Sequence, residues 1–280
     1  MTAGDDGQAA AGRLGAPAPG GPARAWDNSG MPAENRPAAE RRRQASSFGA
    51  VAAVYERGRP PYPPAAVDWL LPEGASRVLD LGAGTGKLTR QLRDRGLDVI
   101  AVEPSAGMRA ELARAVPGVP VHAGSAEEIP LPGGSVEVVL VAQAWHWVDR
   151  SRAVPEVARV LVPGGRLGLL WNIRDEREDW VAELDRLMYD PGEHRREDRG
   201  HIGPPFGPVE HRDVEWAHRL SRDELIDMMA SRSYVITMPE PQRAAVLAAV
   251  ARLADSRAGL TGPDGLVLPY VTECYRAELG

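Results

Sequence analysis

Short apolar runs alternate with segments of helical spacing through the middle of the chain, residues 77–173. The unbroken apolar run from Val138 to Val141 is typical of a strand buried on both faces of a parallel sheet. Strands are expected at 77–81, 98–103, 119–123, 136–142 and 166–173, with helices between them at 87–95, at 105–115 and up to 161. Ser105 can cap the second helix, and Pro155 should delay the regular part of the third to about residue 153. Repeated strand–helix units predict an α/β fold, an open parallel sheet with helices on both faces.

The flanking regions have a different pattern. Before the first strand, a helical pattern at 39–57 leads into an extended proline-rich segment at 59–64 and a short helix at 65–71. After residue 174, the expected elements are a charged helix at 175–190, a Gly/Pro-rich loop at 191–208, a strand at 209–220, helices at 221–230 and 239–254, and a last strand at 265–275.

Composition separates a tail from the folded part. Ala, Gly and Pro make up 22 of residues 1–38, so this segment buries too little apolar surface to offset its ordering entropy, and we expect it to be disordered. The chain of 280 residues, 43% of them hydrophobic, can otherwise form one sizeable α/β domain or two small ones, and we assign 39–280 to one domain.

Charge and cysteine content narrow the function classes. The net charge is −6 and no basic stripe is present, which argues against a nucleic-acid partner. No apolar run is long enough to span a membrane, and no secretory signal is visible. The single cysteine, Cys274, fits a reducing compartment, so we expect a cytoplasmic location.

The most informative segment is a glycine-rich loop that follows the first strand. Asp80 ends an apolar run, and Gly82, Gly84 and Gly86 alternate after it, which allows a tight turn and a close approach of a ligand to the backbone. The dinucleotide fingerprint fails in both registers because Lys87 and Thr89 stand where glycine is required. The phosphate-loop pattern fails as well, because it requires glycine at position 81 and Ser or Thr at position 88, and both are leucine.

A second carboxylate lies at the end of the next strand. In an open α/β sheet, ligands bind at the carboxyl ends of neighbouring strands, so Glu103 should lie close to the loop after Asp80. A carboxylate at this position can accept two hydrogen bonds from a ribose diol. The two carboxylates and the glycines together indicate a nucleoside site.

These segments resemble the class I S-adenosylmethionine-dependent methyltransferases. Residues 80–86 resemble the cofactor signature, 102–108 the ribose segment, 124–127 the adenine segment and 161–165 the turn before the fifth strand. Ser125 is a departure, since the family commonly has Asp there. The resemblance implies a doubly wound, Rossmann-like sheet of seven mostly parallel strands whose last strand is antiparallel. It also implies S-adenosylmethionine as cofactor, with S-adenosylhomocysteine as product.

The resemblance also assigns candidate cofactor contacts. They are Tyr55, Arg59, Asp80, Gly82, Ala83, Gly84, Thr85, Gly86, Glu103, Pro104, Met108, Ser125, Ala126, Glu127 and Gln143. Asp80 can order the loop or receive the cofactor's ammonium group, while Ala126 and Glu127 are the remaining candidates for the adenine contact.

Two flanking motifs resemble the small-molecule branch, which includes ubiquinone/menaquinone-type and trans-aconitate-type enzymes. They are Tyr55-x-x-x-Arg59-Pro60-x-Tyr62-Pro63 and the segment from Gln143 to Trp147. The resemblance implies a small-molecule acceptor, with no nucleic-acid or membrane partner. Residues 39–72 are then an N-terminal helical lid, and 175–208 cap the acceptor site.

Candidate acceptor-site residues follow from this arrangement. His146 comes after the fourth strand and is either a general base or a residue that shapes the pocket. Arg59 can pair with a carboxylate of the cofactor or of the substrate. Aromatic acceptor contacts are expected from Tyr62, Trp145, Trp147, Trp171 and Tyr234.

Several alternatives stay open at this point. The scattered histidines show no metal-ligand spacing, so no metal is expected. A protein of the same fold that binds the cofactor without methyl transfer is the main alternative. A nicotinamide oxidoreductase is disfavoured by Lys87 and Thr89, and macromolecular methylation by the acidic charge balance. The sequence leaves the acceptor and the oligomeric state (monomer or homodimer) undetermined.

Overall fold

The computed structural model describes residues 59–188, 199–232, 235–236, 238–257 and 265–280. All of them belong to one unit of the chain, residues 41–280. The predicted tail at 1–38, the first part of the predicted lid at 39–58 and the candidates Tyr55 and Tyr234 lie outside the described residues. None of the helices in the described ranges is long and apolar enough to cross a membrane.

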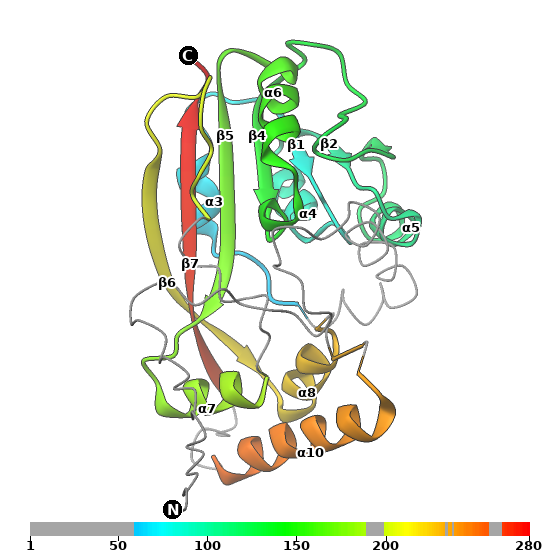
Figure 1. The fold of residues 1–280 in the computed structure, drawn as a ribbon, viewed down its shortest axis with the longest axis vertical. Coiled ribbons are helices and arrows are strands. Elements are labelled where there is room, and N and C mark those ends of the chain that lie inside the picture. The colour runs from blue at the N-terminus through cyan, green and yellow to red at the C-terminus, as the bar shows by residue number, and fades with distance from the viewer. Residues whose placement is uncertain (1–58, 189–198, 233–234, 237, 258–264) are drawn as a thin grey trace, which may run out of the picture. The chain divides into compact units, whose positions relative to one another are not determined.

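A seven-stranded sheet forms the centre of the fold (Figure 1). Its strands are β1 (Arg77–Leu81), β2 (Asp98–Val102), β3 (Val121–His122), β4 (Val136–Ala142), β5 (Leu161–Arg174), β6 (Glu210–Leu220) and β7 (Leu266–Glu278). Their order is β3-β2-β1-β4-β5-β7-β6, and β7 is antiparallel to both of its neighbours. The predicted Rossmann-like, mostly parallel sheet with an antiparallel last strand is therefore confirmed.

Helices cover both faces of the sheet because successive strand residues point in opposite directions. Val138 packs on one face with α3 (Pro64–Leu70) and α4 (Lys87–Asp94). Val139 packs on the other face with α6 (Arg150–Val160). The apolar run in β4 is thus buried on both sides, as its sequence predicts.

Helix α6 differs from the sequence prediction at its start. It begins at Arg150 rather than near residue 153, because the Asp149 side chain accepts a hydrogen bond from the Ser151 N–H at 3.1 Å and caps the helix. Pro155 lies inside the helix and cannot donate to the preceding turn. The cap and the buried face, which includes Val157, outweigh the loss of that one bond.

Strand β5 also begins earlier than predicted, at Leu161 instead of residue 166. Leu161 pairs with Val136 on β4, and the register between the two strands shifts after this pair. The Pro-Gly-Gly turn therefore lies within β5. Strand β3 is shorter than predicted. It comprises Val121–His122, which pair with Ala101 and Val102 of β2.

Three helices after β5 form a cap at the carboxyl end of the parallel strands (Figure 1). These cap helices are α7 (Asp179–Leu187), α8 (Arg222–Ala230) and α10 (Glu240–Ser256). A separate apolar core joins them to β7, and it includes Leu184, Leu225, Val250 and Leu268. The cap therefore stands over the edge of the sheet where α/β proteins bind their ligands.

Candidate active site

The glycine loop connects β1 to α4 and is fixed by backbone bonds to the neighbouring strand. The N–H groups of Gly82 and Ala83 donate to the carbonyl of Val102 at 2.8 and 3.2 Å. Gly84 and Gly86 have φ angles of 57° and 92°, values that side chains disfavour. The loop thus follows a path that this glycine spacing permits.

Asp80 is fully buried at the start of the loop. The Thr89 hydroxyl donates to its Oδ2 at 2.6 Å, while its Oδ1 is buried and has no hydrogen-bond partner among the described residues. Burial raises the pKa of this carboxyl to about 7, the bond from Thr89 opposes the rise, and the charge of Glu103 adds to it. An orphaned carboxylate oxygen of this kind suits a cationic hydrogen-bond donor.

Glu103 follows β2 and is buried against the same loop. The Gly84 N–H donates to its Oε2 at 3.0 Å, and the Ser105 N–H donates to its Oε1 at 2.8 Å. Burial raises the pKa of this carboxyl, and the two backbone bonds oppose that rise. Each oxygen keeps a lone pair for a further donor, so the carboxylate can still accept from a diol.

Helix α5 (Ala106–Ala115) begins beside Glu103. The Ser105 hydroxyl caps it by accepting from the Met108 N–H at 3.4 Å, as the sequence predicts. Leu112 of this helix packs so closely on Gly86 that an added Cβ at Gly86 would lie 2.9 Å from Leu112 Cγ. Glycine at this position therefore meets both the backbone and the packing requirement.

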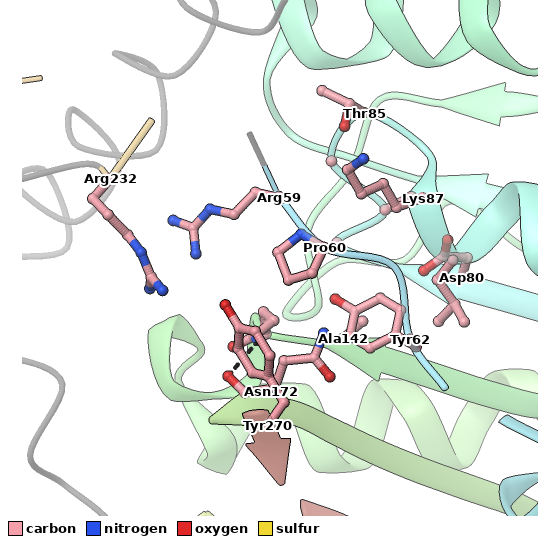
Figure 2. A pocket seen from close by; sticks show the side chains of 15 residues that line it. Arg59, Pro60, Tyr62, Asp80, Thr85, Lys87, Ala142, Asn172, Arg232 and Tyr270 are labelled. Atoms are coloured by element: carbon pink, nitrogen blue, oxygen red, sulfur yellow. Dashed lines mark hydrogen bonds between the residues drawn. The ribbon is translucent and has the colours of Figure 1, made fainter. Parts of the chain in front are cut away.

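A cavity that is partly open to solvent lies next to the loop. Figure 2 shows Asp80, Thr85 and Lys87 at one end and Arg59 and Arg232 at the other. The wall between them comes from Pro60, Tyr62, Ala142, Gln143, Asn172 and Tyr270. The cavity thus joins the ends of β1, β4, β5 and β7 to the segment that precedes α3.

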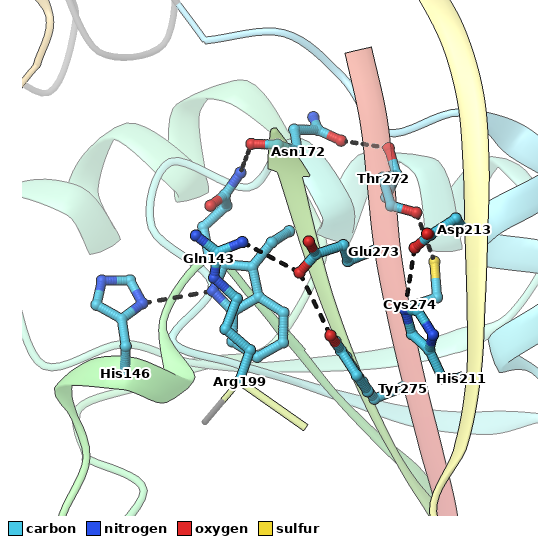
Figure 3. Close-up of polar contacts among 11 residues, drawn as sticks. Gln143, His146, Asn172, Arg199, His211, Asp213, Thr272, Glu273, Cys274 and Tyr275 are labelled. Carbon is cyan, nitrogen blue, oxygen red and sulfur yellow. Dashed lines mark hydrogen bonds and ion pairs between the residues drawn. The ribbon is translucent and has the colours of Figure 1, made fainter. Parts of the chain in front are cut away.

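Gln143 directly follows β4 and has a strained backbone conformation. Its φ is 57°, and it is the one non-glycine residue with positive φ in the described ranges. Its N–H donates to the carbonyl of Leu170 at 2.9 Å, and its Nε2 donates to the carbonyl of Asn172 at 3.2 Å (Figure 3). Strain of this kind is typical of functional positions, which the surrounding structure holds in place.

Asn172 connects the cavity to the antiparallel strand. Its Oδ1 accepts from the Thr272 hydroxyl at 2.7 Å (Figure 3), and Thr272 Oγ1 in turn accepts from the Trp216 indole N–H at 2.8 Å. The Asn172 amide also donates to the carbonyl of Pro61 at 2.9 Å. One side chain therefore fixes the segment over the cavity relative to β5 and β7.

A second pair of bonds holds that segment on its other side. The Tyr62 N–H donates to Gln91 Oε1 at 3.1 Å, and Gln91 Nε2 donates back to the Tyr62 carbonyl at 2.7 Å. The proline-stiffened turn predicted from the sequence thus becomes a fixed wall of the cavity.

Comparisons with known proteins agree with this geometry. The methyltransferase domain family matches residues 79–169. An uncharacterized methyltransferase of Mycobacterium tuberculosis is 55% identical over 239 residues, which cover 85% of this chain and 98% of that protein. An uncharacterized methyltransferase-like protein of Schizosaccharomyces pombe is 32% identical over 246 residues, covering 83% and 95%. A solved structure from Anaeromyxobacter dehalogenans, proposed as a type II methyltransferase, is 26% identical with a TM-score of 0.62, covering 78% of this chain and 97% of that one.

The chain belongs to the class I S-adenosylmethionine-dependent methyltransferases. The family match spans β1 to β5, so it contains the glycine loop and Glu103. The predicted family, fold class and enzyme class are confirmed.

The remaining predicted cofactor contacts of this methyltransferase lie along the β2 and β3 side. Met108 and Ala126 are buried, whereas Pro104 is exposed. Ser125 forms a small bridge with Glu128, its N–H donating to the Glu128 carbonyl at 3.3 Å. The Glu127 carboxylate accepts from the Asp149 N–H at 2.8 Å. None of these residues, nor Glu103, belongs to the described cavity wall, so their cofactor roles stay predictions.

The predicted aromatic contacts of the methyltransferase divide by location. Tyr62 lines the cavity. Trp145, in the short helix η3 (Trp145–Trp147), and Trp171 are buried in the core beside α6, and Trp147 is 40% exposed. The three tryptophans do not belong to the described cavity wall.

His146 also lies away from the described cavity wall. Its Nδ1 accepts a hydrogen bond from the Trp171 indole N–H at 3.4 Å (Figure 3), so in the neutral ring the proton is on Nε2. Accepting a second proton at Nδ1 would break this contact. The general-base role of His146 therefore stays a prediction, and this contact argues against it.

Six cavity residues of the methyltransferase were missed as site residues by the sequence reasoning. They are Pro60, Lys87, Leu88, Asn172, Arg232 and Tyr270, and Ala142 of the wall was missed as well. Lys87 could have been found from its place at the start of α4, directly after the loop. Arg232 and Tyr270 are far from the glycine loop in the sequence, and the tertiary structure brings them to the cavity. Within the described ranges, no three metal-ligating side chains gather at one place.

Proposed function

We propose that this methyltransferase binds S-adenosylmethionine along the Asp80–Gly86 loop and transfers its methyl group to a small-molecule acceptor in the cavity. The observation that carries the proposal is Asp80 Oδ1, which is buried and has no partner among the described residues, on a residue that lines the cavity. The cofactor's ammonium group is a cationic donor that would satisfy this oxygen. The donor and acceptor set of the loop therefore fits the cofactor.

Glu103 and its neighbours would hold the nucleoside. Glu103 can accept both ribose hydroxyls while its bonds from Gly84 and Ser105 keep the carboxylate oriented. Met108 would supply an apolar contact to the adenine, and Ser125, Ala126 and Glu127 its polar contacts. These assignments follow the family resemblance and the arrangement of β2, β3 and α5.

When bound, S-adenosylmethionine supplies a methyl group on a positively charged sulfur, and an acceptor lone pair forms the new bond as the carbon–sulfur bond breaks and its electron pair stays on sulfur. The protein's task is then to align the acceptor and to exclude water. Tyr62 and Gln143 line the cavity between its two ends, so they are suited to position an acceptor. The described part of the lid segment, from Arg59 onward, and the cap helices would exclude water.

A protein of the same fold that binds the cofactor without transferring the methyl group is the alternative. Calorimetry with S-adenosylmethionine and S-adenosylhomocysteine tests the binding half of the proposal, and we expect micromolar or tighter dissociation constants. Release of S-adenosylhomocysteine in the presence of an acceptor panel tests the transfer half. Failure of both compounds to bind would refute the proposed cofactor site, and binding without turnover on any acceptor would favour the alternative.

The role of His146 requires a separate test. If His146 is a general base, His146→Gln should lower kcat about a hundredfold or more and leave cofactor affinity unchanged. Trp171→Phe removes the hydrogen bond to His146 together with part of a buried ring, so its free energy of unfolding is measured alongside its kcat as a control for structural effects. A kcat that changes less than about twofold in His146→Gln would leave His146 with a structural role.

A further inference from the structure

The two ends of the cavity differ in chemistry. Asp80 lies at the loop end, where the proposed cofactor site is. At the other end, Figure 2 shows the guanidinium groups of Arg59 and Arg232 and the hydroxyl of Tyr270 converging on the same region. Arg59 comes from the segment before α3, Arg232 from the loop directly after α8, and Tyr270 from β7. The arginine end is therefore assembled by tertiary contacts between distant segments.

Tyr270 acts as a neutral hydroxyl in this cluster. Burial raises the pKa of its phenol, while the positive charges of Arg174, Arg232 and Arg59 oppose that rise. The hydroxyl donates to the sulfur of Met228 at 3.5 Å, and its ring stacks on Trp216 with a centroid distance of 5.1 Å. Three guanidinium groups thus lie within electrostatic range of one buried, protonated hydroxyl.

Burying arginine side chains is costly unless anions compensate their charge. Arg232 is only 7% exposed. Arg174 forms an ion pair with Asp185, and Asp185 also lies within electrostatic range of Arg232. Asp185 and Arg174 do not belong to the described cavity wall, whereas Arg232 does. Arg232 is thus the member of this charged group that reaches the cavity wall.

The charged residues along the cavity wall are mostly basic. Among the described residues of the wall, the basic ones are Arg59, Lys87 and Arg232, and the acidic one is Asp80. The proposed cofactor carries a sulfonium, an ammonium and a carboxylate, so it brings a further net positive charge. A negatively charged acceptor would be attracted both by these basic side chains of the wall and by the sulfonium.

We infer that the acceptor carries an anionic oxygen group, a carboxylate or a phosphate, and that Arg232 binds this group together with Arg59, while the Tyr270 hydroxyl turns its one proton from the Met228 sulfur to the anion. This inference rests on the proposed function, because it assigns the substrate class of the same cavity. Guanidinium groups suit both kinds of anion, since their planar set of donors matches two anionic oxygens at once. The apolar part of the acceptor would lie against Pro60 and Tyr62, between the two ends.

The test uses the full-length chain saturated with S-adenosylhomocysteine and three probes of similar size. Phenylacetate carries a carboxylate, phenyl phosphate carries a phosphate, and phenylacetamide is the neutral counterpart of phenylacetate. We expect calorimetry to detect at least one anion and to show it bound about tenfold or more tightly than the amide. The stronger of the two anions identifies whether the site is built for a carboxylate or for a phosphate.

Variants of Arg232 assign the effect to the proposed residue. Arg232→Gln should weaken anion binding about tenfold or more and change the affinity for S-adenosylhomocysteine less than about twofold. Arg222→Gln is the matched control, because Arg222 begins α8, the helix that precedes Arg232, and pairs with Asp255 at the surface. If Arg232→Gln does not fold, Arg232→Lys retains the charge and should keep part of the anion affinity.

Three results would overturn the inference. They are equal binding of the amide and the anions, no binding of either anion to the loaded wild-type protein, or an equal loss of S-adenosylhomocysteine and anion affinity in Arg232→Gln. The last result would assign Arg232 to the cofactor carboxylate. A failure of the proposed function is distinguishable, because S-adenosylhomocysteine would then not bind to the wild-type protein at all.

Discussion

Replacing Asp80 with asparagine should stabilise the ligand-free protein at alkaline pH and weaken its binding of the cofactor. Asparagine has nearly the same shape, and its oxygen can still accept the bond from the Thr89 hydroxyl. It cannot ionise, however, so the substitution removes the burial of a charge at high pH. The change therefore separates what the carboxylate does for folding from what it does for binding.

The magnitude follows from the pKa of Asp80, which burial raises to about 7 in the folded protein from 3.8. Between these two values the folded state holds a proton that the unfolded state has lost, so the free energy of unfolding falls by about 1.4 kcal/mol per pH unit as pH rises. The contribution of Asp80 is then about 3 kcal/mol less favourable at about pH 8 than at about pH 5, because the slope ends near the folded pKa. Asp80→Asn should lack this part of the pH dependence.

Urea unfolding of wild type and Asp80→Asn at about pH 5 and pH 8 measures this difference directly. Glu103, whose pKa burial also raises, contributes pH dependence to both proteins, and the part that comes from its repulsion by Asp80 is lost with the Asp80 charge. Calorimetry should show the opposite order for binding, with S-adenosylhomocysteine held about tenfold or more weakly by Asp80→Asn at pH 8. A stability gap between the two proteins that is the same at both pH values would refute the assignment of a raised pKa to Asp80.

Further predictions test the other side chains of the site. Glu103→Gln should weaken S-adenosylhomocysteine binding about tenfold or more in calorimetry, and an unchanged affinity would exclude Glu103 from the ribose contact. Gln143→Gly should have a free energy of unfolding about 1 kcal/mol higher than Gln143→Ala, as measured by urea unfolding, because only alanine keeps the strain of a positive φ. The reverse order would show that the strain is absent. Asn172→Ala and Thr272→Val should each destabilise by about 1 kcal/mol or more, and the double variant by less than the sum, because the pair shares one hydrogen bond; additive losses in a double-mutant cycle would contradict the network.

The fold was predictable where its signals are local. The apolar run in β4 and the glycine loop after β1 each contain their own information, and both were located from the sequence within a residue or two. Boundaries were less predictable where a distant partner decides them. Leu161 joins β5 because Val136 pairs with it, and α6 extends through Pro155 because a cap and a buried face stabilise it.

The site residues also differ in whether local sequence or tertiary structure reveals them. Asp80 and Glu103 were predictable because Asp80 lies near the end of β1 and Glu103 follows β2, and the carboxyl ends of parallel strands meet at one edge of the sheet. Asn172 and Thr272 are 100 residues apart in the chain and meet only because β7 is inserted beside β5. Arg232 is far from the glycine loop in the sequence and also reaches the cavity through tertiary structure.

Acceptor selectivity can change separately from cofactor binding, because the two ends of the cavity come from different parts of the chain. The match to the methyltransferase domain family ends at residue 169, so it covers the proposed cofactor end of the cavity and excludes Asn172, Arg232 and Tyr270. Substitutions at the arginine end can therefore alter the acceptor without disturbing the bonds that hold Asp80 and Glu103. The two ends are nevertheless joined through the segment over the cavity, because Asn172 fixes Pro61 from one side and Gln91 fixes Tyr62 from the other. A change of acceptor that requires this segment to move should also alter cofactor affinity, whereas a change confined to Arg232 should not.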